Sequence, residues 1–500
     1  MNYFIQQTAA EQDAHLLDCF YDKQYLKQLE GHGLDFITGR KGAGKTALAK
    51  FLTNATSNQA ETISLLRDTA SVTDIISDKA RDKNFTANSV LLFLLVKLVR
   101  QLLSSTPTTR GNDFWTFFLE KNGFTNIDSF AKFRDVRKNS VITIKPSLEI
   151  SHPAGWAAKG ELFSTKGDVT QEEIPLNTGL DELVDHFLDS MPLELSLAIF
   201  VDDIDTRIDL TLDPNSEMLY RLLEKIADFN RRAREKKRQV RIVACIRTDM
   251  WRYLAGSNLN KLRSSSLQIS WNESDFFGLL AKRLDPGWHP QDDDENYTAA
   301  HKLVNEFLPD TAFIDALSTN QIRHFHSNLY NYIFNISFNR PRDFLQFCWI
   351  ATKKLPSSSK STVSPQHLEA IEAEFGGYLR NELKDEFMLF AQTHQIDIKN
   401  IDTLIRELAL KGSLSYRQFK HLAKQHSKEF IGVNPYQLLE HLHEYSVVGF
   451  DMGDFTQFAY SDPEIDFPPE DDLEKADPTL CVHLGLVRTY KIGLLATIKK

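Results

Sequence analysis

The chain has 500 residues, of which 42% are hydrophobic and 25% are charged, and its formal net charge is −10. This length is too great for one simple hydrophobic core and predicts two to four domains. The acidic balance argues against a protein whose whole surface coats nucleic acid, although it leaves room for a local basic patch.

The cysteines and the apolar segments predict a cytoplasmic protein. The four cysteines are far apart, with no CxxC pair and no zinc spacing, so we expect reduced thiols. The N-terminus lacks the basic and apolar regions of a signal peptide. The longest apolar run, VLLFLLV at 90–96, is too short to span a bilayer. We therefore expect a buried helix there and no membrane partner.

The first third of the chain predicts one strand followed by helices. LDFIT at 34–38 is typical of a buried strand, and TALAKFLTNA at 46–55 has the pattern of a helix. Residues 86–103 predict a long apolar helix. The segment 104–180 has poor periodicity and several glycines, and we interpret it as an insertion.

Three further buried strands are predicted to complete an α/β core. The segment 195–205, LSLAIFVDDID, places an apolar run before a group of acids. VRIVACIRTD at 240–249 and SLQISW at 266–271 have similar character. Strands that alternate with helices predict a parallel sheet. From about 272 onward helical segments dominate, and short alternating runs return near the end of the chain.

The segment GRKGAGKTA satisfies the pattern G-x-x-x-x-G-K-[ST] between a predicted strand and a predicted helix. Its glycines let the backbone fold around a chain of phosphates, and the helix N-terminus adds partial positive charge. We expect Lys45 to reach the β- and γ-phosphates of a nucleoside triphosphate, and the Thr46 hydroxyl to ligate Mg²⁺. The absence of an NKxD motif favours ATP over GTP. The predicted nucleotide-binding residues are Gly39, Arg40, Lys41, Gly42, Ala43, Gly44, Lys45, Thr46 and Ala47.

Two aspartates follow the apolar run LAIFV, at the strand end where ligands collect in parallel sheets. We expect Asp202 to be the second Mg²⁺ ligand. We expect Asp203 to be catalytic, because it would orient or deprotonate the attacking water. The alternative is that both acids cap the strand and are solvated.

Three arginines are candidates to stabilise charge on a transferring phosphoryl group. Arg247 ends the strand IVACI, which we expect to neighbour the carboxylate strand, and this would place Arg247 or Thr248 near the γ-phosphate. Arg340 and Arg342 open a predicted helix in SFNRPRDFLQF, where Pro341 suits a first turn. The alternative for each arginine is a structural or surface ion pair.

Together, GRKGAGKTA, FVDDID, CIRTD and FNRPRDFLQF resemble the bacterial P-loop ATPases allied to the AAA+ and STAND superfamilies, whose core is similar to that of origin-recognition-type ATPases. The resemblance covers roughly 10–500 and is weak across 104–180. It implies that FVDDID is a Walker B strand, CIRTD a sensor-1 strand and NRPRD a sensor-2-like motif. AAA+ proteins typically carry Asp-Glu in the Walker B strand, and the shorter Asp203 of this chain predicts slow turnover.

The resemblance also implies a domain plan. We expect a P-loop α/β core over 1–271, a helical lid over 272–375, and a helical linker with a winged-helix-like domain over 376–500. VNPYQLLEHLHEYSVVGFDMGDFTQFAYSD predicts a helix followed by a two-stranded wing, and CVHLGLVRTY would close that domain.

Two charged segments bear on a nucleic-acid partner. NRRAREKKRQVR at 230–241 holds seven basic residues and one acid, and we interpret it as a solvated helix end rather than a binding patch. The stretch 462–477 is acidic, which opposes contact between the predicted winged helix and phosphates. The sequence therefore neither predicts nor excludes a nucleic-acid partner.

Three functions follow from these observations. The first is a Mg²⁺-dependent, ATP-hydrolysing switch that forms a homo-oligomer and acts with a protein effector or sensor. Many members of the group it resembles lie near antiviral defence genes, which implies a role in antiphage defence. The second is a DNA-binding ATPase loader or remodeller that grips a duplex with the winged helix. The third is a P-loop phosphotransferase, which the long helical additions disfavour.

Overall fold

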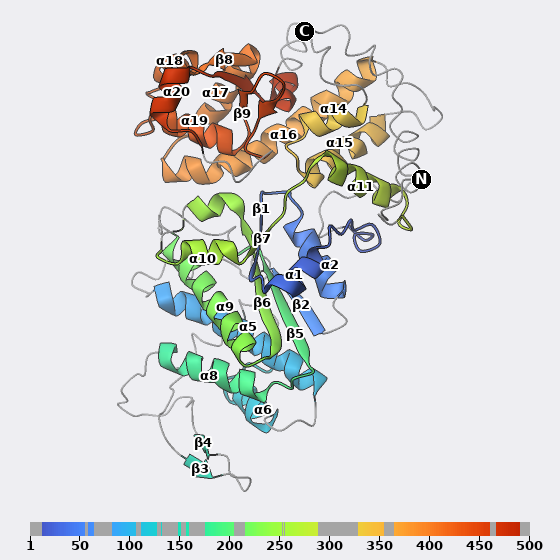
Figure 1. The fold of residues 1–500 in the computed structure, drawn as a ribbon, viewed down its shortest axis with the longest axis vertical. Coiled ribbons are helices and arrows are strands. Elements are labelled where there is room, and N and C mark those ends of the chain that lie inside the picture. Colours follow the sequence, from blue (N-terminus) through green and yellow to red (C-terminus); the bar gives the residue numbers. More distant parts are fainter. Residues whose placement is uncertain are drawn as a thin grey trace. The chain divides into compact units, whose positions relative to one another are not determined.

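A computed structural model gives the arrangement of most of the chain (Figure 1). Its contacts divide the chain into two units. The sheet unit consists of Gln24–Thr38 and Leu48–Gln268, and the C-terminal unit of Met1–Lys23, Gly39–Ala47 and Ile269–Lys500. The predicted domain bounds at 271 and 375 stay a prediction. The structure describes residues 13–55, 59–64, 83–106, 112–127, 132, 149–151, 157–159, 176–204, 216–252, 254, 256–288, 329–354, 365–460 and 467–490.

A five-stranded sheet organises the sheet unit, with the strand order β2-β5-β6-β1-β7. The pairs β2–β5, β5–β6 and β1–β7 are parallel, which confirms the predicted parallel sheet. In the register of β5 and β6, Val201 lies opposite Ala244. The strands are β1 Phe36–Gly39, β2 Gln59–Ser64, β5 Ser196–Asp202, β6 Gln239–Arg247 and β7 Ser266–Gln268.

Three long helices supply much of the core around this sheet. They are α5 Lys83–Ser105, α8 Leu176–Ser190 and α9 Glu217–Glu235. Helix α5 packs on β5 and against α8 and α9, while α9 packs on β6. By length and composition Ala87–Ser105 could cross a membrane, but 78% of its apolar window is buried inside the protein. The prediction of a buried helix at 90–96 is confirmed.

Shorter elements complete the sheet unit. Within the predicted insertion the structure describes one helix and one antiparallel hairpin, in which Ile150 lies opposite Ala158. Much of the rest of 104–180 lies outside the described residues. The shorter elements are α1 Tyr25–His32, α2 Lys45–Ala55, α6 Asn112–Lys121, β3 Glu149–Ser151, β4 Ala157–Lys159, the 3₁₀ helix Thr248–Arg252 and α10 Leu259–Ser264.

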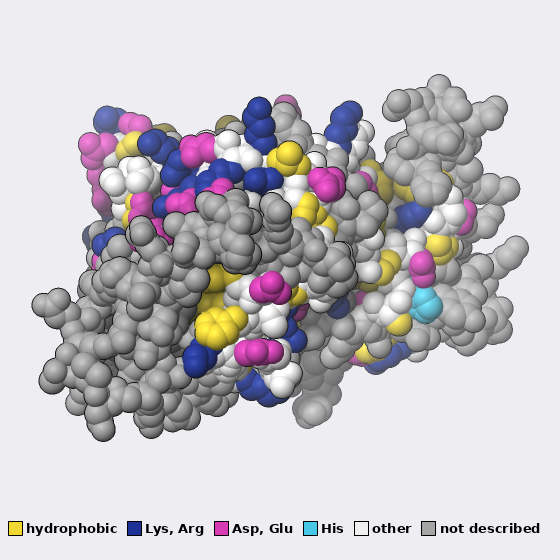
Figure 2. All heavy atoms as spheres, turned by 90° about the horizontal axis from the view of Figure 1, so that it is seen from below, with side chains coloured by type: hydrophobic (Ala, Val, Ile, Leu, Met, Phe, Trp, Pro, Cys, Tyr) yellow, Lys and Arg dark blue, Asp and Glu magenta, His cyan; other side chains and the backbone are white. Residues whose placement is uncertain are grey.

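The basic run at 230–241 is paired with acids of the same unit. Arg232 lies 3.2 Å from Asp181, and Lys236 lies 2.8 Å from Asp189, both on α8. The face in Figure 2 likewise shows basic and acidic side chains next to one another. Helix α9 ends at Glu235 and β6 begins at Gln239, so the predicted helix end within this run is confirmed, while its role toward nucleic acid stays a prediction.

Helices dominate the C-terminal unit, as predicted. They pack around a four-stranded sheet with the order β10-β9-β11-β8, in which every registered pair is antiparallel. The strands are β8 Ser413–Ser415, β9 Val448–Asp451, β10 Thr456–Gln457 and β11 Thr479–Val482. The helices are α11 Glu273–Leu284, α14 Leu329–Ile336, α15 Pro341–Lys354, α16 Pro365–Thr393, α17 Ile398–Lys411, α18 Tyr416–Gln425, α19 Pro435–Glu444 and α20 Glu470–Ala476.

Local sequence signals explain where several of these helices begin. Asn272, Ser415 and Asn434 each cap a helix, and the third residue of the helix returns a bond to the cap backbone. The predicted helix and two-stranded hairpin before residue 461 are present as α19, β9 and β10. The name winged helix for this part stays a prediction.

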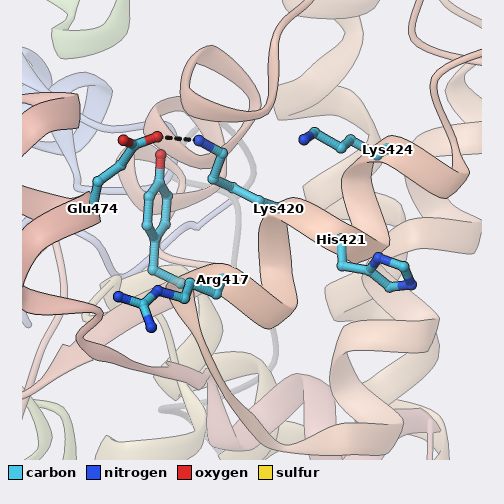
Figure 3. A pocket seen from close by; sticks show the side chains of 6 residues that line it. Arg417, Lys420, His421, Lys424 and Glu474 are labelled. Atoms are coloured by element: carbon cyan, nitrogen blue, oxygen red, sulfur yellow. Dashed lines mark hydrogen bonds and ion pairs between the residues drawn. The ribbon is translucent and has the colours of Figure 1, made fainter.

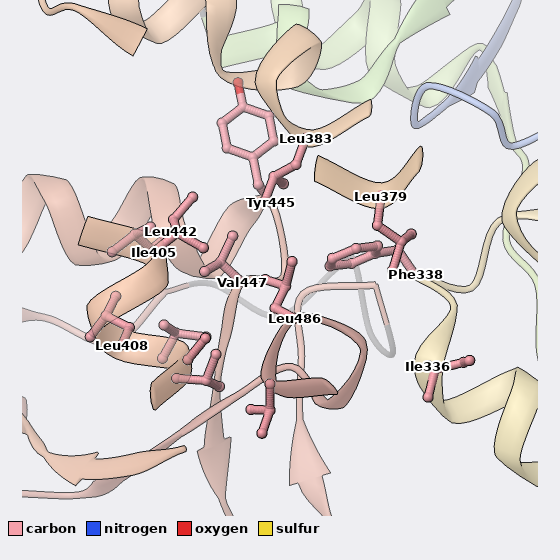
Figure 4. Close-up of a cluster of buried hydrophobic side chains, with 14 of the residues drawn as sticks. Ile336, Phe338, Leu379, Leu383, Ile405, Leu408, Leu442, Tyr445, Val447 and Leu486 are labelled. Atoms are coloured by element: carbon pink, nitrogen blue, oxygen red, sulfur yellow. The ribbon is translucent and has the colours of Figure 1, made fainter. Parts of the chain in front are cut away.

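A continuous apolar core holds the C-terminal unit together. It joins the helices α11 to α19 with the strands β8, β9 and β11. Figure 4 shows Phe338, Leu379, Tyr445, Val447 and Leu486 within this core, although they come from distant parts of the sequence. The turn after α19 is thus built into the core through its own side chains.

One buried amide fastens α9 to the sheet. Asn230 Nδ2 donates to Asp35 Oδ1 at 2.9 Å and to the Ile242 carbonyl at 2.7 Å. Asn230 Oδ1 accepts from the Ile242 N–H at 2.8 Å. Both carboxamide atoms are therefore used, and the side chain links α9, β6 and the residue before β1.

We predict that Asn230→Ala lowers the free energy of unfolding by about 2–4 kcal/mol, because it leaves buried partners unsatisfied. Urea denaturation followed by circular dichroism measures the change. Asn54→Ala, on an exposed position of α2, is the matched control and should change stability by no more than about 0.5 kcal/mol. Equal effects of the two substitutions would contradict the prediction.

Candidate nucleotide-binding site

The predicted phosphate loop has the expected setting of a strand before it and a helix after it. Strand β1 ends at Gly39 and α2 begins at Lys45, so residues 40–44 form the loop. Gly42 and Gly44 have φ values of +79° and +102°. L-amino acids with side chains rarely adopt such values, so the bend requires glycine at both positions.

The side chain of Lys45 folds back onto the loop. Its Nζ donates to the carbonyl of Gly39 at 2.9 Å and to that of Arg40 at 3.2 Å. An ammonium has three donors, so these bonds leave a third N–H for a phosphate oxygen. Thr46 and Ala47 follow in the first turn of α2 and are half-buried.

Other residues of the loop contact parts of the C-terminal unit that are distant in the sequence, and the loop itself belongs to this unit. Lys41 Nζ lies 2.9 Å from Asp385 Oδ2 on α16, and the Trp271 indole N–H donates to the Ala43 carbonyl at 2.8 Å. Arg40 also points its guanidinium at residues of this unit. For Arg40 and Lys41, contact with a nucleotide would therefore come from the backbone N–H groups.

The structure brings Arg340 and Arg342 against the loop. A Cβ atom at Gly42 would lie 3.4 Å from Arg342 Cβ and 3.5 Å from Arg340 Cδ. A Cβ atom at position 42 would thus make ordinary van der Waals contacts with these arginines, and the positive φ remains the reason for glycine there. Residues about 300 positions apart in the sequence meet at this point.

The two arginines differ in how they are held. The Arg340 side chain is 1% exposed, with Nε 2.6 Å from Asp343 Oδ2 and Nη1 bonded to Glu386. Burial lowers the pKa of Arg340, but the charges of Asp343 and Glu386 raise it by more than that. The net pKa lies above the ordinary value, so the guanidinium stays charged. The Arg342 side chain is 30% exposed and lies 3.6 Å from Glu382. Arg340 therefore forms a structural ion pair, and Arg342 keeps more freedom.

The remaining predicted site residues lie at the carboxyl ends of β5 and β6 in the five-stranded sheet. Asp202 ends β5, is 3% exposed and lies opposite Ser64 of β2. Asp203 follows at φ +56°, a conformation that aspartate tolerates better than most residues. The predicted neighbourhood of β5 and β6 is confirmed. Arg247, at the end of β6, donates from Nε to Asp249 Oδ1 at 3.0 Å, so its charge is engaged by a carboxylate.

Sequence reasoning missed the residues that hold the loop from the C-terminal unit. Three carboxylates of α16 are spaced i, i+3 and i+4, which places them on one face of the helix. This spacing in the sequence could have predicted an acidic helix face. The contact of Trp271 with Ala43 has no comparable signal in the sequence. The three carboxylates are Glu382, Asp385 and Glu386.

A buried histidine lies near the loop arginines. The His483 ring stacks on Phe338, with centroids 4.2 Å apart, and its Nδ1 accepts from the Gly485 N–H at 3.2 Å. Burial, together with the charges of Arg40 and Arg340, lowers the pKa of His483 to about 3. The ring is therefore neutral near pH 7.

Comparisons with known proteins add little to this picture. No protein-family model matches the chain, and no curated protein matches it. The Walker-type ATPase PABY2304 of Pyrococcus abyssi is 11% identical with a TM-score of 0.33, over 94% of this chain and 93% of that chain. Cdc6p of Pyrobaculum aerophilum is 11% identical with a TM-score of 0.31, over 100% of this chain and 97% of that chain. Both similarities are too low to assign a function to this chain.

We predict that His483 makes stability fall in acid. Between pH 6.5 and about 3 the unfolded chain binds a proton on this ring and the folded chain does not. The contribution is complete above pH 6.5 and is lost as the pH falls, by at most about 1.4 kcal/mol per pH unit. Urea midpoints at pH 7 and pH 5 should therefore differ less for His483→Gln than for the wild type. The same pH dependence in both proteins would show that this ring does not titrate as described.

Proposed function

We propose that this chain binds and hydrolyses ATP with Mg²⁺ and uses the nucleotide as a molecular switch. The observation that carries the proposal is the phosphate loop. A buried strand leads into a bend with glycines at positive φ, and a helix begins at Lys45, whose ammonium lies against the loop carbonyls. Backbone N–H groups at such a helix N-terminus attract phosphate.

The hydroxyl of Thr46 and the carboxylate of Asp202 are oxygen ligands of the kind that Mg²⁺ prefers. This ion is commonly held by one or two carboxylates together with water and substrate phosphates. In the proposal the Thr46 hydroxyl and the Asp202 carboxylate hold it. When bound, the ion neutralises charge on the phosphate oxygens. The protein's own groups then hold the triphosphate, through the loop N–H groups and Lys45.

Asp203 is proposed to orient or deprotonate the attacking water. Its left-handed backbone sets its side chain apart from the regular alternation of β5, and non-glycine residues held in this way occur often at functional sites.

The arginines have separate roles in the proposal. Arg342 is the candidate to stabilise transition-state charge, because its side chain is partly exposed beside Gly42. Arg340 shapes the loop through its buried ion pairs. Arg247 would have to leave Asp249 to reach a phosphate. Homo-oligomer formation, a protein effector or sensor, and antiphage defence are proposed from the sequence resemblance alone.

We predict that Lys45→Ala abolishes phosphate release, and that Asp203→Asn still binds ATP but turns over at least about 100-fold more slowly. Phosphate release and calorimetric titration with MgATP measure the two effects. Lys399→Ala, an exposed lysine on α17, is the matched control and should act as the wild type. A wild type no faster than Lys45→Ala would end the hydrolysis proposal.

One observation favours a second function, DNA binding. A cavity of about 490 Å³ on the surface of α18 is lined mainly by cations (Figure 3). Arg417 and Lys424 are exposed there, with Arg417 Nε 3.7 Å from Asp477 Oδ2, and Lys420 bonds to Glu474 of the acidic helix α20. The cations would attract phosphate groups, whereas the acidic side chains of α20 would repel them. The lining residues are Tyr416, Arg417, Lys420, His421, Lys424 and Glu474.

If this second function is correct, duplex DNA should shift in a gel at low salt, and affinity should fall steeply between about 50 and 200 mM salt. The double substitution Arg417→Ala/Lys424→Ala should weaken binding and flatten the salt dependence by about two phosphate contacts. Lys399→Ala should leave both unchanged. A lack of any shift at low salt would eliminate DNA binding.

A further inference from the structure

The phosphate loop has a set of contacts that the proposed chemistry does not use. Arg40 Nη1 donates to Ser446 Oγ at 3.0 Å, and Arg40 Nη2 donates to the Tyr445 carbonyl at 3.1 Å. The same guanidinium lies 3.6 Å from Glu386 Oε2. All three partners are buried. Arg40 thus ties the loop to the turn between α19 and β9.

That turn is itself rigidly held. Ser446 has φ +58°, its N–H donates to the His443 carbonyl at 2.7 Å, and its Oγ accepts from the Tyr460 N–H at 3.3 Å. The Tyr445 ring packs against Phe387, with centroids 4.6 Å apart. The turn is anchored in the apolar core, so Arg40 has a fixed point to hold.

The tie extends to the arginine beside the loop. Glu386 contacts Arg40 and also bonds to Arg340, which in turn bonds to Asp343. The Tyr378 hydroxyl donates to Asp343 at 2.9 Å. One buried chain of bonds therefore joins the loop, α15, α16 and the turn, and a displacement of the loop would disturb all of them.

We propose that Arg40 is a positioning residue that fixes the phosphate loop to the Tyr445–Ser446 turn and thereby couples nucleotide binding to the C-terminal four-stranded sheet. The inference rests on the proposed ATP-binding function. A loop held in its binding shape loses less freedom when the phosphates arrive, so the tie raises affinity. By linkage, bound nucleotide strengthens the tie and steadies the turn. Strand β9 begins at Val448, two residues beyond Ser446, so the effect reaches the sheet.

Lys41 offers a matched comparison for charge. It is the neighbouring cation of the same loop, and its partners are the half-buried Glu382 and Asp385, whose side chain is 63% exposed. The ion pair with the exposed Asp385 contributes little to stability. Lys41→Met therefore removes the same unit of charge as Arg40→Met without removing a buried tie.

The experiment is calorimetric titration of the full chain with MgATP. Arg40→Met should weaken binding about tenfold or more, and Lys41→Met clearly less. Ser446→Gly removes the hydroxyl without changing charge, and glycine suits φ +58°. It should weaken binding several-fold, and the double variant Arg40→Met/Ser446→Gly should bind as Arg40→Met does, because the two residues act as one unit. Arg40→Lys should rescue only in part, since a lysine cannot reach both acceptors at once.

Hydrogen exchange provides a readout that a purely structural role would not move. MgATP should slow exchange of the backbone amides in 445–451 of the wild type, and this slowing should be absent in Arg40→Met. Thermal unfolding without nucleotide confirms that each variant is folded. If Arg40→Met does not fold, the same exchange measurement is made on Ser446→Gly. If MgATP slows exchange of 445–451 in Ser446→Gly as much as in the wild type, the inference is overturned.

The outcomes separate the inference from the function on which it rests. A wild type that binds no MgATP refutes the proposed function and the coupling with it. A wild type that binds, with equal losses for Arg40→Met and Lys41→Met and additive effects of Arg40→Met and Ser446→Gly, refutes the coupling alone.

Discussion

The sharp bend of the backbone between β1 and α2 is the constraint on which the rest of the site depends. The positive φ values at Gly42 and Gly44 turn the chain tightly enough for Lys45 to reach the carbonyls behind it. Larger residues would be strained in this conformation, and Gly42 lies within van der Waals reach of Arg340 and Arg342. The bend therefore decides both where a phosphate could lie and which helix can approach it.

Charge around the loop is balanced by carboxylates of the C-terminal unit. Breaking a buried ion pair leaves an uncompensated charge and is strongly unfavourable, so Arg340 and Glu386 act as a fixed part of the fold. Arg342 and Lys41 have weaker, more exposed pairs and can respond to a ligand at lower cost. The loop thus combines a rigid support with adjustable cations.

The predicted site residues at the carboxyl ends of β5 and β6 also differ in how they are held. Asp202 is buried at the end of β5, where its backbone lies opposite Ser64 of β2, while the pairing with β6 ends one residue earlier, at Val201. Asp203 has a left-handed backbone at φ +56°, so its side chain does not follow the alternation of β5. Arg247 is engaged by Asp249 across a two-residue separation, so a nearby anion has to compete with that carboxylate for it.

The sequence by itself determined the features that depend on short-range pattern. The strand-loop-helix around Lys45, the buried strand before Asp202, the long apolar helix near 90–96 and the helix-hairpin before residue 461 all follow from local periodicity, glycine and capping. Only the tertiary structure decided that Arg40 holds Ser446, and that Arg340 is buried between two carboxylates. Those contacts join residues up to about 400 positions apart. They depend on which helix faces pack together, a choice that local pattern does not contain.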